Sequence, residues 1–238
     1  MPIQQKAYPN LEEAEKLLQD MPSHSLKDRR ARAVFASAFL GALRADTIAS
    51  LRVEHIDIAQ RRIIQDTKIS RSKAGKSIVV SWFPIPRPFE EEVISWLNEL
   101  RRLNFQNGDA AIPAEKRLKL RSPVGPRIPV PTTTQIVTDA FKCACQNSPK
   151  SYTPHAARHT ISAARDERQL TQMQRKAWST NMGHTTEQTT DQWYGNIPDE
   201  KRIEIMQDIV ETTADSIEVA GILADVIEYI EGRFKKLS

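Results

Sequence analysis

The segment Pro154–His155–Ala156–Ala157–Arg158 is the first place where residue types and spacing suggest chemistry. His155 and Arg158 stand three residues apart at the start of an expected helix, which puts both side chains on one helix face. A helix N-terminus offers unpaired amides and the positive end of the helix dipole, and arginine adds a bidentate donor suited to phosphate. Standing alone, the segment is better explained as a solvated polar helix start.

A second cluster follows in Met182–Gly183–His184 and Trp193–Tyr194–Gly195. Gly183 can end a helix in a left-handed turn, so that His184 projects from the loop beyond it. Tyr194 lies ten residues further on. Each residue has a simpler explanation, because a lone tyrosine usually packs and a lone histidine is usually satisfied on the surface or in the core.

Two cations occupy unusual places. Lys73 lies in a polar turn between two β-branched runs, where a hairpin tip could carry its amine into a nucleic-acid groove; the simpler interpretation is a solvated turn. Arg44 directly follows the apolar run 38–43. A buried guanidinium needs an acidic partner, a ligand or an edge position, and Asp46 is the structural alternative.

Two further patterns mimic known sites and fail in detail. His155 and His159 have the spacing of two zinc ligands in metalloproteases, but Ala156 stands where a glutamate should follow the first histidine. Gly75–Lys76–Ser77 resembles the end of a P-loop, but Ser70 replaces the required earlier glycine and a strand follows instead of a helix. The sequence therefore predicts no metal site and no cofactor.

The elements that position these residues are mainly helical. Helices are expected at about 11–21, 26–42, 48–51, 88–103, 132–146, 154–166, 169–182 and 187–193, with an amphipathic helix at about 215–233. Runs at 56–64 and 78–83 predict an antiparallel hairpin around the turn 72–76. Residues 104–131, rich in proline, are expected to form a loop. The fold class is therefore mixed: one mainly α domain with a small antiparallel β-sheet.

The composition of the chain limits the classes of protein to which it can belong. The 238 residues have a mean hydropathy of −0.50, no apolar run long enough for a membrane span, and no secretory signal at the N-terminus. Cys143 and Cys145 are too few for a disulfide framework, so a reducing cytoplasm is expected. Residues 26–76 hold twelve Lys/Arg against five Asp/Glu, whereas residues 198–238 hold five against ten. The basic half suggests a polyanion-binding body, although an unevenly charged surface explains it about as well.

Taken together and in this order, these residues closely resemble the tyrosine recombinase (phage integrase) family over roughly residues 10–205. The resemblance rests on Arg44 after a helical run, the Ser72–Lys73–Ala74–Gly75–Lys76 turn, the His155 and Arg158 pair, Gly183–His184, and Tyr194. The stretch 176–195 resembles integrases of mobile elements in particular.

The resemblance implies a role for each of these residues. Arg44 and Arg158 would grip the scissile phosphate, His155 and His184 would take the two histidine positions, and Lys73 would be the hairpin lysine. Tyr194 would be the nucleophile that forms a 3′-phosphotyrosyl intermediate without metal or ATP. Two features depart from the pattern: Thr47 stands where the family often has glutamate, and Lys68 competes with Lys73 for the lysine role.

The expected function is therefore site-specific recombination that integrates or excises a mobile element. The alternatives are an inactive DNA-binding module and a type IB topoisomerase-like nicking and resealing activity. Residues 1–205 would form the catalytic domain, and 206–238 a helical tail that docks in cis or in trans. The expected partners are double-stranded DNA and further copies of the chain, a tetramer on DNA and a monomer alone, in the cytoplasm and at the nucleoid when DNA is bound.

Overall fold

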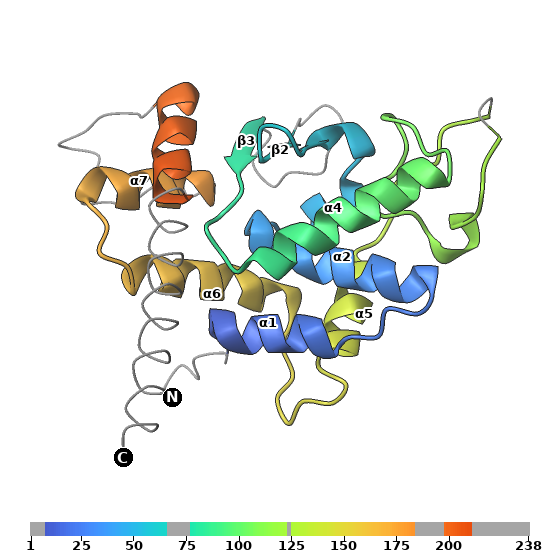
Figure 1. The fold of residues 1–238 in the computed structure, drawn as a ribbon, viewed down its shortest axis with the longest axis horizontal. Coiled ribbons are helices and arrows are strands. Elements are labelled where there is room, and N and C mark those ends of the chain that lie inside the picture. The colour runs from blue at the N-terminus through green and yellow to red at the C-terminus, as the bar shows by residue number, and fades with distance from the viewer. Residues whose placement is uncertain (1–7, 66–76, 123–124, 184–197, 211–238) are drawn as a thin grey trace, which may run out of the picture.

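The structure is a computed structural model that describes residues 8–65, 77–122, 125–183 and 198–210 (Figure 1). The helices are α1 (Leu11–Asp20), α2 (Leu26–Leu40), α3 (Ala45–Ser50), α4 (Arg87–Arg102), α5 (Gln135–Ala144), α6 (Pro154–Asp166) and α7 (Gln172–Asn181). Two short 3-10 helices cover Val53–His55 and Glu115–Arg117, and residues 199–210 are also helical. The predicted class, mainly helical with a small antiparallel sheet, is confirmed.

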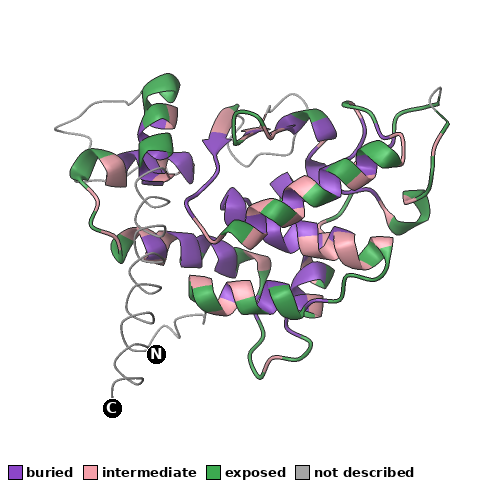
Figure 2. Ribbon diagram, viewed as in Figure 1, coloured by how far each residue is buried: buried purple, intermediate pink, exposed green. Residues whose placement is uncertain are grey.

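Helix α2 forms the centre of the molecule and packs against α4, α5 and α6. It begins with a capping box, in which the Ser25 hydroxyl accepts from the Asp28 amide and the Asp28 carboxylate accepts from the Ser25 amide. Its second half is buried on every side, as the purple ribbon in Figure 2 shows. Phe39 contacts three aromatic rings at centroid distances of 5.0–6.3 Å, those of Phe35, Phe89 and Phe141. This aromatic cluster joins α2, α4 and α5.

The sheet is a three-stranded antiparallel meander of β1 (Ile56–Asp57), β2 (Arg62–Gln65) and β3 (Ile78–Ser81). The register pairs Ile63 with Val80 and Gln65 with Ile78. The predicted hairpin is therefore confirmed in its strands. Its turn, with Lys68 and Lys73, lies outside the described residues.

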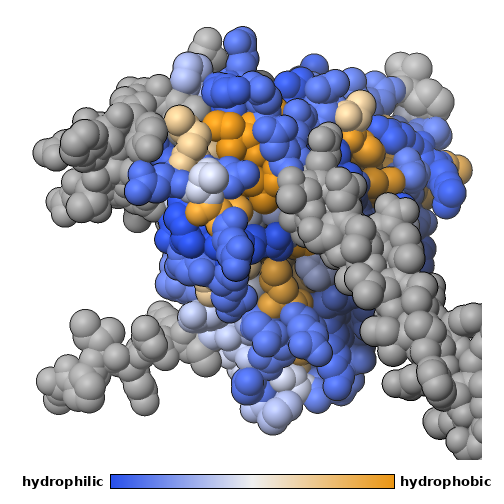
Figure 3. Space-filling model, turned by 60° about the vertical axis from the view of Figure 1, so that its left-hand side comes forward, coloured by the Kyte–Doolittle hydropathy of each residue, from blue (hydrophilic) through white to orange (hydrophobic). Residues whose placement is uncertain are grey.

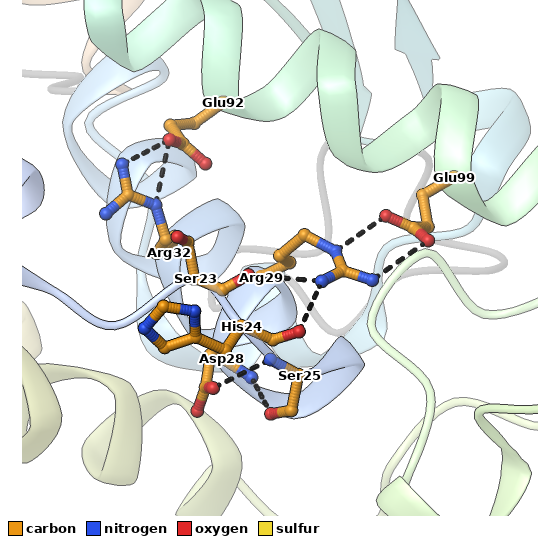
Figure 4. Close-up of polar contacts among 8 residues, drawn as sticks. All are labelled: Ser23, His24, Ser25, Asp28, Arg29, Arg32, Glu92 and Glu99. Atoms are coloured by element: carbon orange, nitrogen blue, oxygen red, sulfur yellow. Dashed lines mark hydrogen bonds and ion pairs between the residues drawn. The ribbon is translucent and has the colours of Figure 1, made fainter.

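Ion pairs between α2 and α4 use several of the cations that give residues 26–76 their positive excess (Figure 4). Arg29 binds both carboxylate oxygens of Glu99, at 2.7 and 3.1 Å, and Arg32 pairs with Glu92. Arg30 is buried and donates to the carbonyl of Pro113. The interpretation of this basic excess as a polyanion-binding surface is thus wrong for these three arginines, because Arg29 and Arg32 pair α2 with α4 and Arg30 is bonded inside the fold.

A buried carboxylate organises the region 104–131, which was expected to be a loop. Asp109 is 2% exposed, accepts from the amides of Gln106 and Ile128, and pairs with Arg121. Apart from the short turn Glu115–Arg117, the described part of this region is irregular, as expected. This buried side chain and backbone hydrogen bonds, such as that from the Ala110 amide to the Ile128 carbonyl, hold the region in place.

The helix at 199–210 was not predicted. Its buried face consists of Arg202, Ile205, Met206 and Ile209, so the boundary expected at 205/206 falls inside a packed helix. Helix α7 begins at Gln172 and not at 169, because the Thr171 side chain caps it there. The helices expected at 187–193 and 215–233 lie outside the described residues. Within the described ranges, no helix is both long and apolar enough to cross a membrane.

Candidate active site

The end of α2 positions Arg44. The chain leaves the helix through a Schellman motif, in which the Leu43 amide donates to the Ala38 carbonyl and the Ala42 amide to that of Phe39. Ala42 takes the left-handed conformation, with φ of 46°, that this motif normally gives to glycine. The glycine of this turn, Gly41, stands one residue before the left-handed position. Its lack of a side chain is needed there because a Cβ would meet the Ile63 side chain at 2.9 Å. Helix α2 therefore stops at Leu40, and not at Ala42 as expected, and Arg44 is the exposed N-cap of α3.

The first turns of α6 position His155 and Arg158. Pro154 occupies the first helical position, where a missing N–H costs nothing, so the helix begins where the sequence predicts. Arg158 is 6% exposed. One guanidinium nitrogen donates to the carbonyl of Ala42 and the other to that of Met182, the latter at 2.7 Å. Arg158 therefore fastens the end of α2 to the end of α7.

Arg44 lies close enough for its positive charge to affect the pKa of Arg158. Burial, and after it the positive charge of Arg44, lower the pKa of Arg158 to about 10. The guanidinium still carries its proton at neutral pH. Two repelling cations, one of them removed from water, favour an anion beside them, and a phosphate oxygen accepts the paired donors of arginine well.

His155 lies on the exposed side of the same helix start. Its ring meets that of His159 edge-on at 4.7 Å, and the ring of Tyr8 stacks on His159 at 5.8 Å. Within the described ranges, no three His, Cys, Asp or Glu side chains are grouped as metal ligands would be. The side chain of His155 is thus presented at the surface from the helix that also carries Arg158.

The segment that leads toward Tyr194 leaves α7 at a glycine. Gly183 has φ of 73°, as its expected left-handed turn requires, and its amide donates to the Thr180 carbonyl at 2.8 Å. His184 and Tyr194 follow it and, like Lys73, lie outside the described residues. The structure describes three of the six predicted site residues: it places Arg44 near Arg158, and His155 on the exposed side of the helix that carries the buried Arg158. It also describes the ends of the segments that hold the other three.

Sequence reasoning missed the backbone groups that hold the site. The carbonyls of Ala42 and Met182 orient Arg158, yet neither residue stands out by type. The available signal was indirect: a glycine and an alanine directly after an apolar helical run, and a glycine directly after Met182. Both places are helix ends, where carbonyls lack helical partners and can accept from a side chain.

A separate polar cavity of about 480 Å³ lies against the region 104–131. Its lining includes Glu54, Asn107, Arg121 and Arg127, and none of the predicted site residues. The surface in Figure 3 is mostly hydrophilic, with apolar side chains gathered in its upper half.

The family comparison agrees with this geometry. The model of the phage integrase family matches residues 10–201. The chain belongs to the phage integrase family. No curated protein sequence matches this integrase-family chain.

Solved structures of integrases and recombinases share its fold. XerA recombinase matches with a TM-score of 0.52 at 19% identity, over 85% of this chain and 65% of that one. An integrase from mycobacterium phage Brujita matches with 0.54 at 16%, over 87% and 58%. A lambda integrase dimer bound to a COC' core site matches with 0.52 at 15%, over 81% and 61%. The chain thus spans less than two thirds of the length of these three chains.

Proposed function

We propose that this chain is the catalytic domain of a site-specific DNA recombinase that integrates or excises a mobile element. The observation that carries the proposal is the Arg44–Arg158 pair, built where the ends of α2 and α7 meet the start of α6. Membership of the phage integrase family supports it, as does the fold shared with a lambda integrase that was crystallised on DNA.

Cleavage would use Tyr194 as the nucleophile. Its phenol oxygen attacks the scissile phosphorus while His155 takes the phenol proton, which is needed because a phenol has a pKa of about 10. The bond from phosphorus to the 5′ oxygen breaks, and Lys73 gives that oxygen a proton. The products are a 3′-phosphotyrosyl bond and a free 5′ hydroxyl.

The remaining cations stabilise the charge that this step creates. Attack places extra negative charge on the non-bridging oxygens, toward which Arg44, Arg158 and His184 would direct donors. Removing one such preorganised donor typically costs about 2.7–4 kcal/mol of barrier. The phosphodiester bond is exchanged and not hydrolysed, so a 5′ hydroxyl from another strand can reverse the step and rejoin the DNA.

The test uses a pool of nicked suicide duplexes with randomised sequence, because the recognition site is then not needed in advance. The full chain is incubated with the pool in EDTA, and adducts that survive denaturation are isolated and their DNA is sequenced. Wild type is expected to give an adduct enriched in one sequence. Tyr194→Phe is expected to give none, while it retains DNA on a filter as wild type does.

Other outcomes favour the other functions. Retention of DNA without an adduct from any duplex would identify an inactive binding module. An adduct on all sequences, with relaxation of supercoiled plasmid and no joining between two labelled sites, would identify a topoisomerase-like activity. Joined products from two labelled copies of the enriched sequence would identify a recombinase.

The tail belongs to the proposal as the surface that joins copies on DNA. A chain that ends at Val210 keeps Met206 and Ile209, which are buried in the body, and loses residues 211–238. We expect both it and the full chain to be monomeric alone, and we expect it to form smaller assemblies than the full chain on the enriched duplex. Gel filtration with light scattering measures this, and equal assemblies on DNA would count against docking in trans.

A further inference from the structure

Asn181, the last residue of α7, forms a two-point hydrogen bond with strand β3. Its side-chain oxygen accepts from the Ser81 amide at 2.9 Å, and its side-chain nitrogen donates to the Ser81 carbonyl at 2.8 Å. Asn181 is fully buried, and Ser81 is 3% exposed. One amide side chain therefore replaces a strand partner at this edge of the sheet and attaches α7 to it.

Arg202 completes the network from the helix 199–210, which lies beside α7 in Figure 1. Its side chain has no exposed surface; one terminal nitrogen donates to the same Asn181 oxygen at 2.7 Å, and the other pairs with Asp199 at 2.9 Å. The Asp199 carboxylate is mostly exposed, so most of the cost of burying the guanidinium remains. An apolar residue would continue the buried face of Ile205, Met206 and Ile209 at lower cost.

These three residues sit at the ends of three different segments. Ser81 ends β3, which follows the segment with Lys73, and Asn181 ends α7, three residues before His184. Arg202 lies in the first turn of the helix 199–210, which follows Tyr194 in the sequence. The next residue after Asn181 is Met182, whose carbonyl accepts from Arg158. Residues 181 and 182 are thus held in two ways. The Asn181 side chain is hydrogen-bonded to β3 and Arg202, and the Met182 carbonyl accepts from Arg158.

We propose that Ser81, Asn181 and Arg202 form a positioning lock, which sets the register of the segments that carry Lys73, His184 and Tyr194 relative to Arg158. The role rests on the function proposed above. Hydrogen bonds to a single amide are directional, whereas apolar contacts at the same place would let the elements slide. The lock lowers the stability of the fold and in return fixes the relative positions of three segments. This role explains why Arg202, a charged residue, occupies a buried position.

The test compares two buried arginines. Arg202→Met keeps the volume and apolar stem and removes the donors. Arg30→Met is the matched control, because Arg30 is also buried and donates to one carbonyl, that of Pro113, without touching the lock. Arg202→Lys restores a charge and a donor. Each full-length variant is assayed for adduct formation in a single turnover with saturating protein, well below its unfolding temperature, and for DNA retention.

We expect Arg202→Met to slow adduct formation at least tenfold with unchanged DNA retention, Arg202→Lys to recover part of the rate, and Arg30→Met to stay within twofold of wild type. Equal rates for the two methionine variants would overturn the lock. If Arg202→Met does not fold, Asn181→Asp takes its place, since it keeps the acceptor and loses the donation to Ser81.

Amide hydrogen exchange separates failure of the lock from failure of the proposed function. Exchange at residues 78–81, 178–183 and 199–210 is expected to rise in Arg202→Met and not in Arg30→Met, whatever the protein does to DNA. Absence of a rise would overturn the lock. A rise together with no adduct from wild type would overturn the proposed function, and with it the positioning role, while leaving the contact itself established.

Discussion

At the scale of single residues, Arg158 determines both the geometry of the site and its energetic cost. Its donors hold the Ala42 and Met182 carbonyls, and burial together with Arg44 lowers its pKa to about 10. Because the folded pKa is below the ordinary pKa of an arginine, the protonated form destabilises the fold at all pH values below about 10. This cost is relieved only as the pH rises above about 10.

Removing the charge of Arg44 should therefore stabilise the free protein and impair the reaction. We expect Arg44→Gln to raise the free energy of unfolding by about 0.5 kcal/mol at low ionic strength, since Arg44 is exposed and its repulsion is screened. Urea unfolding at two salt concentrations measures the gain, which should shrink with salt. A loss of more than about 1 kcal/mol would show that Arg44 supports the fold.

The same variant should slow adduct formation by about 10²–10³, the usual effect of losing one transition-state donor. Bulk retention of DNA should change little, because many phosphate contacts contribute to it. An unchanged rate of adduct formation would remove Arg44 from the site.

Residue types and spacing predicted Arg44, His155 and Arg158 as site residues, yet they could not reveal which of the two arginines is buried. Arg44 follows an apolar run and is exposed, whereas Arg158 lies between His155 and His159 in the sequence and is buried. The difference arises from a left-handed turn at Ala42, a residue whose type gives no hint of positive φ.

At the scale of elements, local signals predicted helices well where they were strong. Pro154 marks the start of α6, and Asn10 caps α1 through the Glu13 amide, as its sequence indicates. The helix 199–210 was missed because one position of its buried face is an arginine, which breaks the apolar stripe. A partner such as Asn181, 21 residues away in sequence, cannot be inferred from spacing.

The region 104–131 should depend on Asp109. Asp109→Ala removes the carboxylate that pairs with Arg121 and accepts from the amides of Gln106 and Ile128. Breaking a buried ion pair by removing one partner typically costs about 3–5 kcal/mol, so we expect a loss in that range in urea unfolding. As a comparison, Asp139→Ala at an exposed pair with Lys142 should cost under about 1 kcal/mol. Equal losses would contradict a central role for Asp109.

At the scale of the whole molecule, several of the positive charges counted in the sequence are engaged in ion pairs within the fold. Arg29 and Arg32 form ion pairs across the α2–α4 interface, and Arg121 forms an ion pair with Asp109. The cations between residues 101 and 127 that remain exposed are Arg101, Arg102, Lys116, Arg117, Lys119 and Arg127. Charge counts along a sequence cannot separate these groups, because ion pairs join residues 60–70 positions apart.

The two groups of cations should differ in the salt dependence of DNA binding. If Lys119 contacts a phosphate, Lys119→Ala should reduce the slope of log affinity against log salt by about 1. Arg29→Gln should leave the slope unchanged and lower stability instead, because its charge is engaged by Glu99. Binding titrations at four salt concentrations measure both slopes. A reduced slope for Arg29→Gln alone would reverse the assignment of the two groups.

The most direct test of the account is to find the atom that becomes linked to DNA. Adduct trapped on the enriched duplex is digested with nuclease and trypsin, and the modified peptide is fragmented in a mass spectrometer. Tyr194 is the sole tyrosine of the tryptic peptide 177–201, so we predict a nucleotide mass on that peptide, at Tyr194. A nucleotide on Tyr8, Tyr152, Tyr229 or a serine would contradict the account.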